Sequence, residues 1–244
     1  MTIKVLVNGA FGRMGQATQK AIGENPAFEL VGSTSKEYDL KQAIIDSKAE
    51  VVIDFTHPDA VYQNTLDIIA AGARPVIGTT GLTLDQVHKL KAKCAELKLG
   101  GIIAPNFSLG AVLMMKYAKE IAKYMPTAEI IEAHHENKAE SPSGTALRTA
   151  EMMASANPKI NQHIQPSKDI IPFTRGGNYK QIPIHAIRLP GFLAQQQVIF
   201  GNSGETLTIH HHAIDRACFM PGVCLACEKV MGLDHLVYGL DEVL

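Results

Sequence analysis

The chain has 244 residues, of which 46% are hydrophobic and 19% charged, and its 23 basic and 24 acidic residues give a net charge of −1. This composition excludes a mainly disordered chain, and the charge balance argues against a surface dominated by nucleic-acid contacts. No apolar run approaches the roughly 18 residues of a membrane span, and no secretory signal is evident at the N-terminus. Four cysteines do not make a disulfide scaffold, so we expect a cytoplasmic protein.

Strand and helix patterns alternate through the first hundred residues. Short apolar runs predict strands at residues 4–8, 28–31, 51–55, 74–77 and 101–104. Helical patterns between them cover residues 13–23, 39–47, 58–71 and 83–97. Such alternation builds βαβ units, and strands buried on both faces are continuous apolar runs. We therefore predict an α/β domain with a parallel sheet of the nucleotide-binding type.

The pattern changes after Pro105. Helices are predicted at residues 109–124, 143–154 and 219–231, and strands at 129–133, 182–188, 195–200 and 206–211. Residues 157–180 are rich in Pro, Gly, Asn and Lys and predict loops, and Gly201-Asn202-Ser203-Gly204 predicts a hairpin. The simplest architecture is the α/β domain followed by an α+β domain, with a boundary near Pro105.

A glycine-rich turn follows the first strand and opens a helix. The spacing of Gly9, Gly12 and Gly15 is a variant of the dinucleotide fingerprint, which brings a pyrophosphate close to backbone N–H groups at a helix N-terminus. The alternative is a purely structural turn. We predict cofactor contacts from the six residues Gly9, Ala10, Phe11, Gly12, Arg13 and Met14.

The end of the second strand bears on the choice of cofactor. An acidic residue there usually binds the ribose of NAD, but this chain has Ser35 and Lys36, and its first carboxylate is Glu37. A hydroxyl and a lysine suit a 2′-phosphate, which favours NADPH, with NADH as the alternative donor. Lys36 as an ordinary surface lysine is the other interpretation.

Three further polar segments follow strands at the edge where ligands sit in open α/β sheets. They are Asp54-Phe55-Thr56, Gly78-Thr79-Thr80-Gly81 and Ala104-Pro105-Asn106-Phe107-Ser108. Together they predict a nicotinamide pocket, with Gly78, Thr79, Thr80, Ala104, Pro105, Asn106 and Phe107 as cofactor contacts.

The densest set of reactive side chains lies in residues 132–146. His134 and His135 end a strand, and Lys138 follows in a loop. Because neighbouring strand residues point to opposite faces, both histidines enter one site only if the strand ends there. An ordinary polar surface loop is the alternative.

The next residues predict a helix start. Ser141 is a candidate N-cap with Pro142 at the first helical position, and N–H groups near Ser143, Gly144 and Thr145 would form an anion site. Histidines and a lysine beside it suit a carboxylate substrate that needs a proton donor.

Two other motifs invite a metal interpretation. His210 and His212 share a strand face, and Cys224 and Cys227 lie in a helical segment. The histidines, with Asp215 and Cys218 further on, match no standard zinc spacing, and Cys224-x-x-Cys227 is an isolated pair with no second pair. We therefore predict no metal and structural thiols.

These motifs together resemble the 4-hydroxy-tetrahydrodipicolinate reductase, or dihydrodipicolinate reductase, family of bacterial lysine and diaminopimelate synthesis. The segment from Glu132 to Ala146, with His134, His135 and Lys138, is similar to the family signature, and the glycine turn and three strand-end loops also match. The resemblance covers essentially the whole chain.

The resemblance implies a fold and an activity. The fold is a Rossmann-type domain of residues 1–105 and 213–244, with a smaller α+β substrate-binding and oligomerisation domain of residues 106–212. The protein would be an NAD(P)H-dependent oxidoreductase and a homotetramer. It would reduce 4-hydroxy-tetrahydrodipicolinate, a cyclic dicarboxylate, to tetrahydrodipicolinate with loss of water. The two domains would close over the ligands by a hinge.

The resemblance also implies residue roles. His134 would be the general acid/base and Lys138 a proton donor, while His135, Ser143, Gly144 and Thr145 would bind substrate.

The chain departs from the family pattern at three places. The signature usually has Asp where this chain has Glu140, and some relatives have an acidic residue and Arg where it has Ser35-Lys36. At residues 189–192 and 195–197 the family pattern is more polar and includes an acidic residue and a histidine, which this chain lacks. That segment would shape either the substrate edge or an oligomer contact.

Two other functions compete with this one. A different small-acid dehydrogenase would share only the nucleotide-binding half, against which the His134-His135-Lys138 segment argues. A catalytically silent cofactor binder is disfavoured because both His134 and Lys138 are present.

Overall fold

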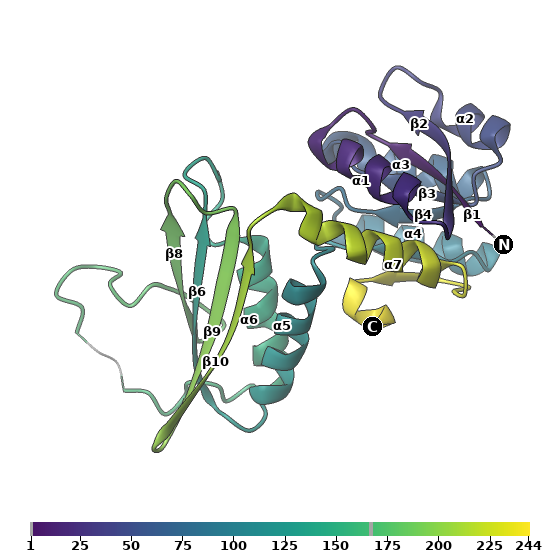
Figure 1. Ribbon diagram of the computed structural model, residues 1–244. Helices are drawn as coiled ribbons and strands as arrows, with labels where there is room; N and C mark the ends of the chain where they lie inside the picture. Colours follow the sequence, from purple (N-terminus) through teal and green to yellow (C-terminus); the bar gives the residue numbers. More distant parts are fainter. Residues whose placement is uncertain (1, 166–167) are drawn as a thin grey trace. The chain divides into compact units, whose positions relative to one another are not determined.

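The computed structural model describes residues 2–165 and 168–244, which form two compact units (Figure 1). Unit 1 joins the chain up to Leu109 with Arg216–Leu244, and unit 2 is Gly110–Asp215. The predicted domain ends at residues 105 and 212 lie close to these divisions. Residues 166 and 167, within the predicted loop 157–180, lie outside the described residues.

Unit 1 is built on a parallel sheet of six strands in the order β11-β5-β4-β3-β1-β2. The strands are β1 (Ile3–Asn8), β2 (Phe28–Thr34), β3 (Val51–Asp54), β4 (Arg74–Ile77), β5 (Gly101–Ile103) and β11 (Leu236–Tyr238). The chain runs from β1 outward to β2 and then back to β3 on the other side of β1. Parallel sheets of this kind bind ligands at the carboxyl ends of the strands beside such a reversal.

Helices cover both faces of this sheet. They are α1 (Arg13–Glu24), α2 (Leu40–Ser47), α3 (Pro58–Ala70), α4 (Leu84–Leu97) and α7 (Met220–Val230), with short 3-10 turns at Arg216–Phe219 and Leu240–Val243. Helices α2, α3 and α4 pack in sequence, and α1 packs against α7. The central strand residues Val5, Leu6 and Val7 are fully buried, as the continuous apolar run predicts.

Unit 2 has a mixed sheet of five strands in the order β10-β9-β6-β8-β7. They are β6 (Thr127–His134), β7 (Gly177–Tyr179), β8 (Ile182–Arg188), β9 (Ala194–Asn202) and β10 (Glu205–Ala213). Helices α5 (Leu109–Ile121) and α6 (Gly144–Ala156) lie along one face (Figure 1). Ala128, Ile130 and Glu132 of β6 are buried, while alternate residues such as Glu129 are only partly covered.

The predicted fold class is confirmed, and the hairpin at residues 201–204 joins β9 to β10, where Asn202 pairs with Glu205. The prediction missed β11 and placed β7 inside a loop, because three-residue strands are too short to show a period. Within the described residues, no helix has the length and apolar character of a membrane span.

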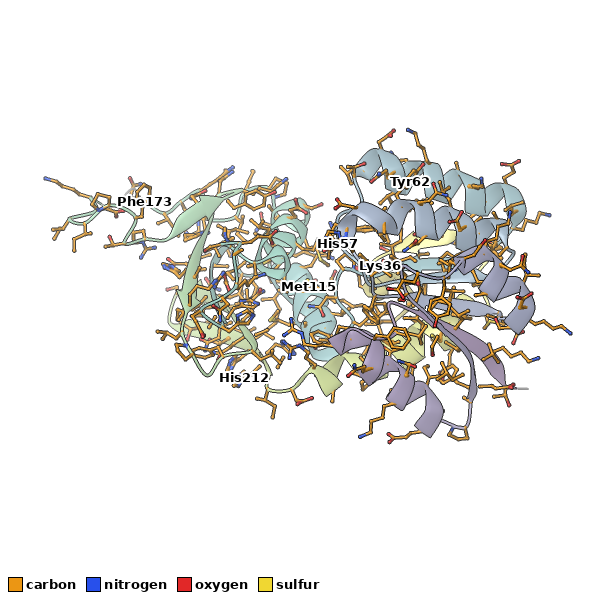
Figure 2. The ribbon with its side chains drawn as sticks, turned by 90° about the horizontal axis from the view of Figure 1, so that it is seen from above. Lys36, His57, Tyr62, Met115, Phe173 and His212 are labelled. Carbon is orange, nitrogen blue, oxygen red and sulfur yellow. The ribbon has the colours of Figure 1, made fainter. Side chains whose placement is uncertain are left out.

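Phe173, which precedes β7, lies away from the unit 2 sheet and is 83% exposed (Figure 2).

The packing of α7 yields a stability prediction. A Cβ on Gly222 would lie 1.9 Å from the carbonyl oxygen of Phe107, a backbone atom that cannot move aside, whereas a Cβ on Gly23 of α1 meets nothing within 4 Å. Gly222→Ala should therefore lower the free energy of unfolding by about 1–3 kcal/mol. Gly23→Ala should raise it by about 0.5–1 kcal/mol. Urea denaturation measures both, and equal effects of the two substitutions would contradict this packing.

Candidate active site

The glycine turn of unit 1 is held by close backbone contacts. Gly9 has φ +80°, and a Cβ there would lie 2.2 Å from the carbonyl oxygen of Phe55. A Cβ on Gly15 would lie 2.1 Å from the carbonyl oxygen of Gly9. The amides of Gly9 and Ala10 both donate to the carbonyl of Thr34, each at 3.0 Å. The turn therefore requires glycine at both positions and is anchored to the end of β2.

A buried carboxylate ties the neighbouring strand ends together. Asp54, at the end of β3, is fully buried and accepts five hydrogen bonds. Its Oδ2 accepts from the side chains of Asn8 and Asn64, each at 2.9 Å. Its Oδ1 accepts from the Thr79 hydroxyl at 2.6 Å and from the hydroxyl and amide of Thr56 at 2.7 and 3.2 Å. Asn8 also accepts from Thr34, so β1, β2, β3 and the loop after β4 share one network.

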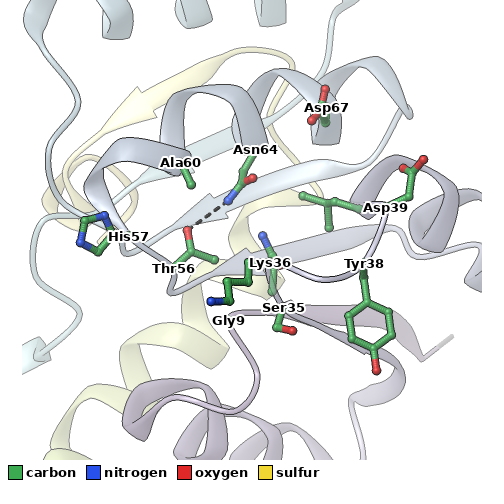
Figure 3. A pocket seen from close by; sticks show the side chains of 12 residues that line it. Gly9, Ser35, Lys36, Tyr38, Asp39, Thr56, His57, Ala60, Asn64 and Asp67 are labelled. Atoms are coloured by element: carbon green, nitrogen blue, oxygen red, sulfur yellow. Dashed lines mark hydrogen bonds between the residues drawn. The ribbon is translucent and has the colours of Figure 1, made fainter.

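This network borders a cavity of about 510 Å³ within unit 1 (Figure 3). Its lining includes Gly9, Ser35 and Lys36, as predicted for a cofactor site. Thr56, from the predicted strand-end segment Asp54-Phe55-Thr56, lines it as well. Residues that the sequence analysis did not single out also line it: Asn8, Tyr38, Asp39, Leu40, His57, Ala60, Asn64 and Asp67. Lys36 is the only lysine or arginine among the lining residues. The cavity sits at the predicted strand ends and has one cation beside a hydroxyl, which fits a phosphorylated ribose.

The remaining predicted cofactor contacts lie outside this cavity lining. Gly78, Thr79 and Thr80 follow β4, and Ala104 to Phe107 follow β5. The Phe55 ring joins these two loops, because it packs edge-on against Phe107 at 5.8 Å and a Cβ on Gly78 would lie 2.1 Å from it. The loops therefore form one layer at the carboxyl end of the sheet.

Unit 2 holds a second buried carboxylate, Glu132 of β6, which is 0% exposed. Its Oε2 is 2.6 Å from Nδ1 of His134 and accepts from Nη1 of Arg188 at 2.9 Å. Its Oε1 accepts from Nη2 of Arg188 at 2.7 Å and from the backbone amide of Ser143 at 3.2 Å. Sheet register explains the grouping: His134 and Arg188 are paired on β6 and β8, and Glu132 and His134 share the face toward α6.

The charge of Glu132 follows from these contacts. Burial alone would raise the pKa of this carboxyl, but the hydrogen bonds from His134 and Arg188 outweigh burial and hold its pKa below the ordinary value. Glu132 is therefore ionised at neutral pH, and the bidentate Arg188 guanidinium neutralises it.

The two predicted histidines sit on either side of the strand end. His134 is the last residue of β6, and His135 is the first residue beyond it, so the condition for both to enter one site is met. A turn follows, in which the Lys138 amide donates to the carbonyl of His135 at 3.2 Å. Within the described residues, the Lys138 ammonium has no hydrogen-bond or ion-pair partner.

Helix α6 starts differently from the prediction. Ser143, and not Ser141, is the N-cap: its hydroxyl accepts from the Ala146 amide at 3.2 Å, and the helix begins at Gly144. The predicted Ser141 cap is wrong because Glu132 binds the Ser143 amide and fixes the helix start there. That amide is thus committed to an internal carboxylate, while a Cβ on Gly144 would face open space.

Residues 189–193, which include the divergent stretch 189–192, cross the end of β6. Strands β8 and β9 flank β6, with Arg188 and Ala194 both paired to His134, so the residues joining them pass over that histidine. The Leu189 amide donates to the His134 carbonyl at 3.1 Å. This segment therefore borders the candidate site.

Two other departures from the family pattern have structural explanations. Glu140 contacts Arg188 through its backbone carbonyl, at 2.8 Å, so the contact does not depend on the longer side chain. Gln196, opposite Glu132 on β9, is buried and donates to the Thr149 hydroxyl of α6 at 2.8 Å.

The histidine run and the cysteines are the residues for which the sequence raised a metal interpretation. His210 and His212 stack on one strand face, as predicted, and burial lowers the pKa of His211 on the other. All four cysteines are free, and burial raises the pKa of Cys224 and Cys227. Among the described residues, no group of three His, Cys, Asp or Glu side chains is arranged to hold a metal.

Comparison with known proteins identifies the family. Residues 3–107 match the family model described as dihydrodipicolinate reductase, N-terminus, and residues 110–244 match its C-terminus counterpart. The chain belongs to the dihydrodipicolinate reductase family. Membership makes the protein an oxidoreductase that uses a nicotinamide cofactor, and the match across both units argues against a dehydrogenase that shares only the nucleotide-binding half.

Individual relatives cover the chain from end to end. It is 52% identical over 244 residues to the 4-hydroxy-tetrahydrodipicolinate reductases of Legionella pneumophila (strain Lens) and Coxiella burnetii (strain Dugway 5J108-111), with 100% of both chains covered in each case. The solved structure of dipicolinate-bound dihydrodipicolinate reductase from Paenisporosarcina sp. TG-14 has a TM-score of 0.92 and 38% identity, also over 100% of both chains.

The Asp54 network predicts the effect of removing its charge. In Asp54→Asn, the new amide group faces hydrogen-bond donors in either orientation, since both oxygens of Asp54 accept from donors. The substitution should lower the free energy of unfolding by about 1–3 kcal/mol and weaken binding of the nicotinamide cofactor. Urea denaturation measures the first effect, and fluorescence titrations with NADH and with NADPH measure the second.

The matched control is Asp46→Asn, an exposed carboxylate on α2 that accepts one hydrogen bond from Gln42. Asp46→Asn should change the free energy of unfolding by less than about 0.5 kcal/mol. If Asp54→Asn is as mild as the control, the network does not organise the strand ends.

Proposed function

We propose that this protein reduces 4-hydroxy-tetrahydrodipicolinate to tetrahydrodipicolinate with NADPH, in diaminopimelate and lysine biosynthesis. The full-length likeness to the reductases, which includes the segment with His134, His135 and Lys138, carries the proposal. In the reaction the substrate ring loses its hydroxyl group and a neighbouring ring hydrogen as water, and it gains one hydride and one proton. The site must therefore bind two carboxylates and deliver a proton.

The nicotinamide cofactor would bind unit 1 and supplies the hydride when bound. The cavity beside Gly9, with its bordering strand ends, supports this placement. The turn residues Gly9, Ala10, Phe11, Gly12, Arg13 and Met14 would hold the pyrophosphate at the N-terminus of α1. Ser35 and Lys36 would bind the 2′-phosphate of NADPH, since Lys36 brings the one fixed positive charge to the cavity lining. Gly78, Thr79, Thr80, Ala104, Pro105, Asn106 and Phe107 would border the nicotinamide.

The substrate would bind unit 2. The dipicolinate bound to the Paenisporosarcina relative is a cyclic dicarboxylate, which supports a ligand of that class here. Gly144 and Thr145, in the first turn of α6, would hold one carboxylate through the positive end of the helix. His135 would contact the substrate away from this carboxylate. Ser143 would support substrate binding by capping α6 and so fixing the position of Gly144 and Thr145.

Proton delivery would fall to Lys138 and His134. Lys138 has no partner within the described residues, so its ammonium is available to a ligand. His134 is bound on one side by Glu132 and would serve as the general acid/base.

Assembly and location complete the proposal: a homotetramer in the cytoplasm. The sheet face of unit 2 opposite α5 and α6 carries the partly exposed apolar side chains Ile131, Ile187 and Ile199, of which Ile187 is 38% exposed, and these support self-association there. Light scattering would give four times the chain mass of 26.4 kDa.

The direct test follows absorbance at 340 nm with purified protein and NADPH. The substrate is formed in the cuvette from pyruvate and aspartate semialdehyde by the condensing enzyme, with NADH run in parallel. The proposal expects oxidation that depends on both precursors. Bound NADPH that is not oxidised under these conditions would refute the assigned substrate.

The first variant prediction concerns the proton donor. Lys138→Ala should lower kcat by about 10²–10⁴-fold, because a positioned general acid contributes about that factor, and should leave the Kd for NADPH nearly unchanged. Lys159→Ala, an exposed lysine of the same unit, is the control and should be neutral. A kcat within about tenfold of wild type would remove Lys138 from proton transfer.

The second variant prediction concerns cofactor choice. Lys36→Ala should raise KM for NADPH about tenfold or more, the scale of one lost charge-assisted hydrogen bond, and leave KM for NADH within about twofold. Lys41→Ala, an exposed lysine on α2 that does not line the cavity, should change neither. Equal effects of Lys36→Ala on both cofactors would contradict 2′-phosphate recognition.

A further inference from the structure

The contact between Glu132 and His134 assigns distinct roles to the two ring nitrogens. Glu132 is an ionised carboxylate and can only accept, so His134 Nδ1 carries the hydrogen across the 2.6 Å contact. Nε2 is then the ring nitrogen left to exchange a proton with a ligand. The His134 side chain is 16% exposed and the Glu132 side chain 0%, so solvent does not compete for Glu132.

Arg188 serves this carboxylate rather than a ligand. Its terminal nitrogens donate twice to Glu132 and also to the carbonyls of Ile187 and Glu140, at 2.7 and 2.8 Å. These four bonds use all four hydrogens of the two terminal nitrogens, while Nε is buried without a partner in the part of the chain that the structure describes. Arg188 therefore neutralises Glu132, so that the site does not repel an anionic substrate, but its fork is not available to bind one.

The same carboxylate also holds the start of α6. Oε1 of Glu132 accepts from the Ser143 amide, and the Ser143 hydroxyl caps the helix. One residue later is Gly144, which faces open space. The acid/base histidine and the helix end are thus fixed to the two oxygens of one side chain.

We infer that Glu132 is a positioning residue for proton transfer, which sets the tautomer and orientation of His134 and places the carboxylate-binding start of α6 in register with it. The inference rests on the proposed function, in which His134 exchanges a proton and α6 binds a substrate carboxylate.

Glu129 provides a matched control on the same strand. It binds Arg175 and, at 2.8 Å, Nε2 of His185, so it too joins a histidine and an arginine. Its side chain lies on the opposite sheet face from Glu132 and is 29% exposed. A general effect of losing a β6 carboxylate would therefore show in both variants.

The kinetic test compares Glu132→Gln with Glu129→Gln. Glu132→Gln should lower kcat about 10- to 100-fold, the scale typical of hydrogen-bond partners that orient metal-binding histidines. KM for NADPH should stay within about twofold, because no partner of Glu132 lines the cofactor cavity. Glu129→Gln should leave both constants within about twofold of wild type. Equal losses of kcat in the two variants, or a Glu132→Gln enzyme with wild-type kcat, would overturn the inference.

Nitrogen NMR of protein with ¹⁵N-labelled histidine reports which ring nitrogen of His134 carries the hydrogen. The His134 signals are identified as those absent from the spectrum of His134→Gln. In the wild type, the neutral His134 ring should carry its hydrogen on Nδ1. In Glu132→Gln the amide nitrogen is best placed at the former Oε2 position, where Nδ1 accepts from it, so the hydrogen should move to Nε2. A wild-type ring with its hydrogen on Nε2 would overturn the inference even if Glu132→Gln does not fold.

This spectrum also separates the inference from the proposed function. If wild-type protein fails to oxidise NADPH with the substrate, the proposed function fails. The ring signal still decides whether Glu132 positions His134.

Discussion

A buried negative charge at the end of β6 governs the arrangement of unit 2. Glu132 has lost contact with water, and an isolated carboxylate in that position would be strongly unfavourable. It is stabilised by Arg188, His134 and the Ser143 amide, which come from β8, from its own strand and from the start of α6. Since each of these groups must reach the same two oxygens, the charge fixes the strand end, the segment crossing it and the helix start together.

Unit 1 also has a buried carboxylate that organises the end of a strand. Asp54 collects donors from Asn8, Thr79 and the segment after β3, and the glycine turn is bonded to the end of β2 beside them. In both units a carboxylate at a strand end organises polar groups that local secondary structure alone would leave unplaced. The candidate cofactor and substrate regions are therefore rigid at their bases, which favours catalysis by preorganised groups.

Local signals in the sequence predicted most of the fold. The run Val5–Val7 and the glycine turn predicted β1 and α1, because burial and backbone close approach act on neighbouring residues. The roles of Glu132 and Arg188 were not predicted, since these residues are 56 positions apart and meet only through the register of β6 with β8. For the same reason the capping role moved from Ser141 to Ser143: the deciding partner, Glu132, lies outside the helix signal.

The most direct test of this account is a crystal structure of the protein with dipicolinate. The account predicts one dipicolinate carboxylate at the amides of Gly144 and Thr145, with the ring beside Nε2 of His134 while Nδ1 keeps its bond to Glu132. Dipicolinate bound away from the start of α6, or a His134 ring turned so that Nε2 meets Glu132, would contradict it.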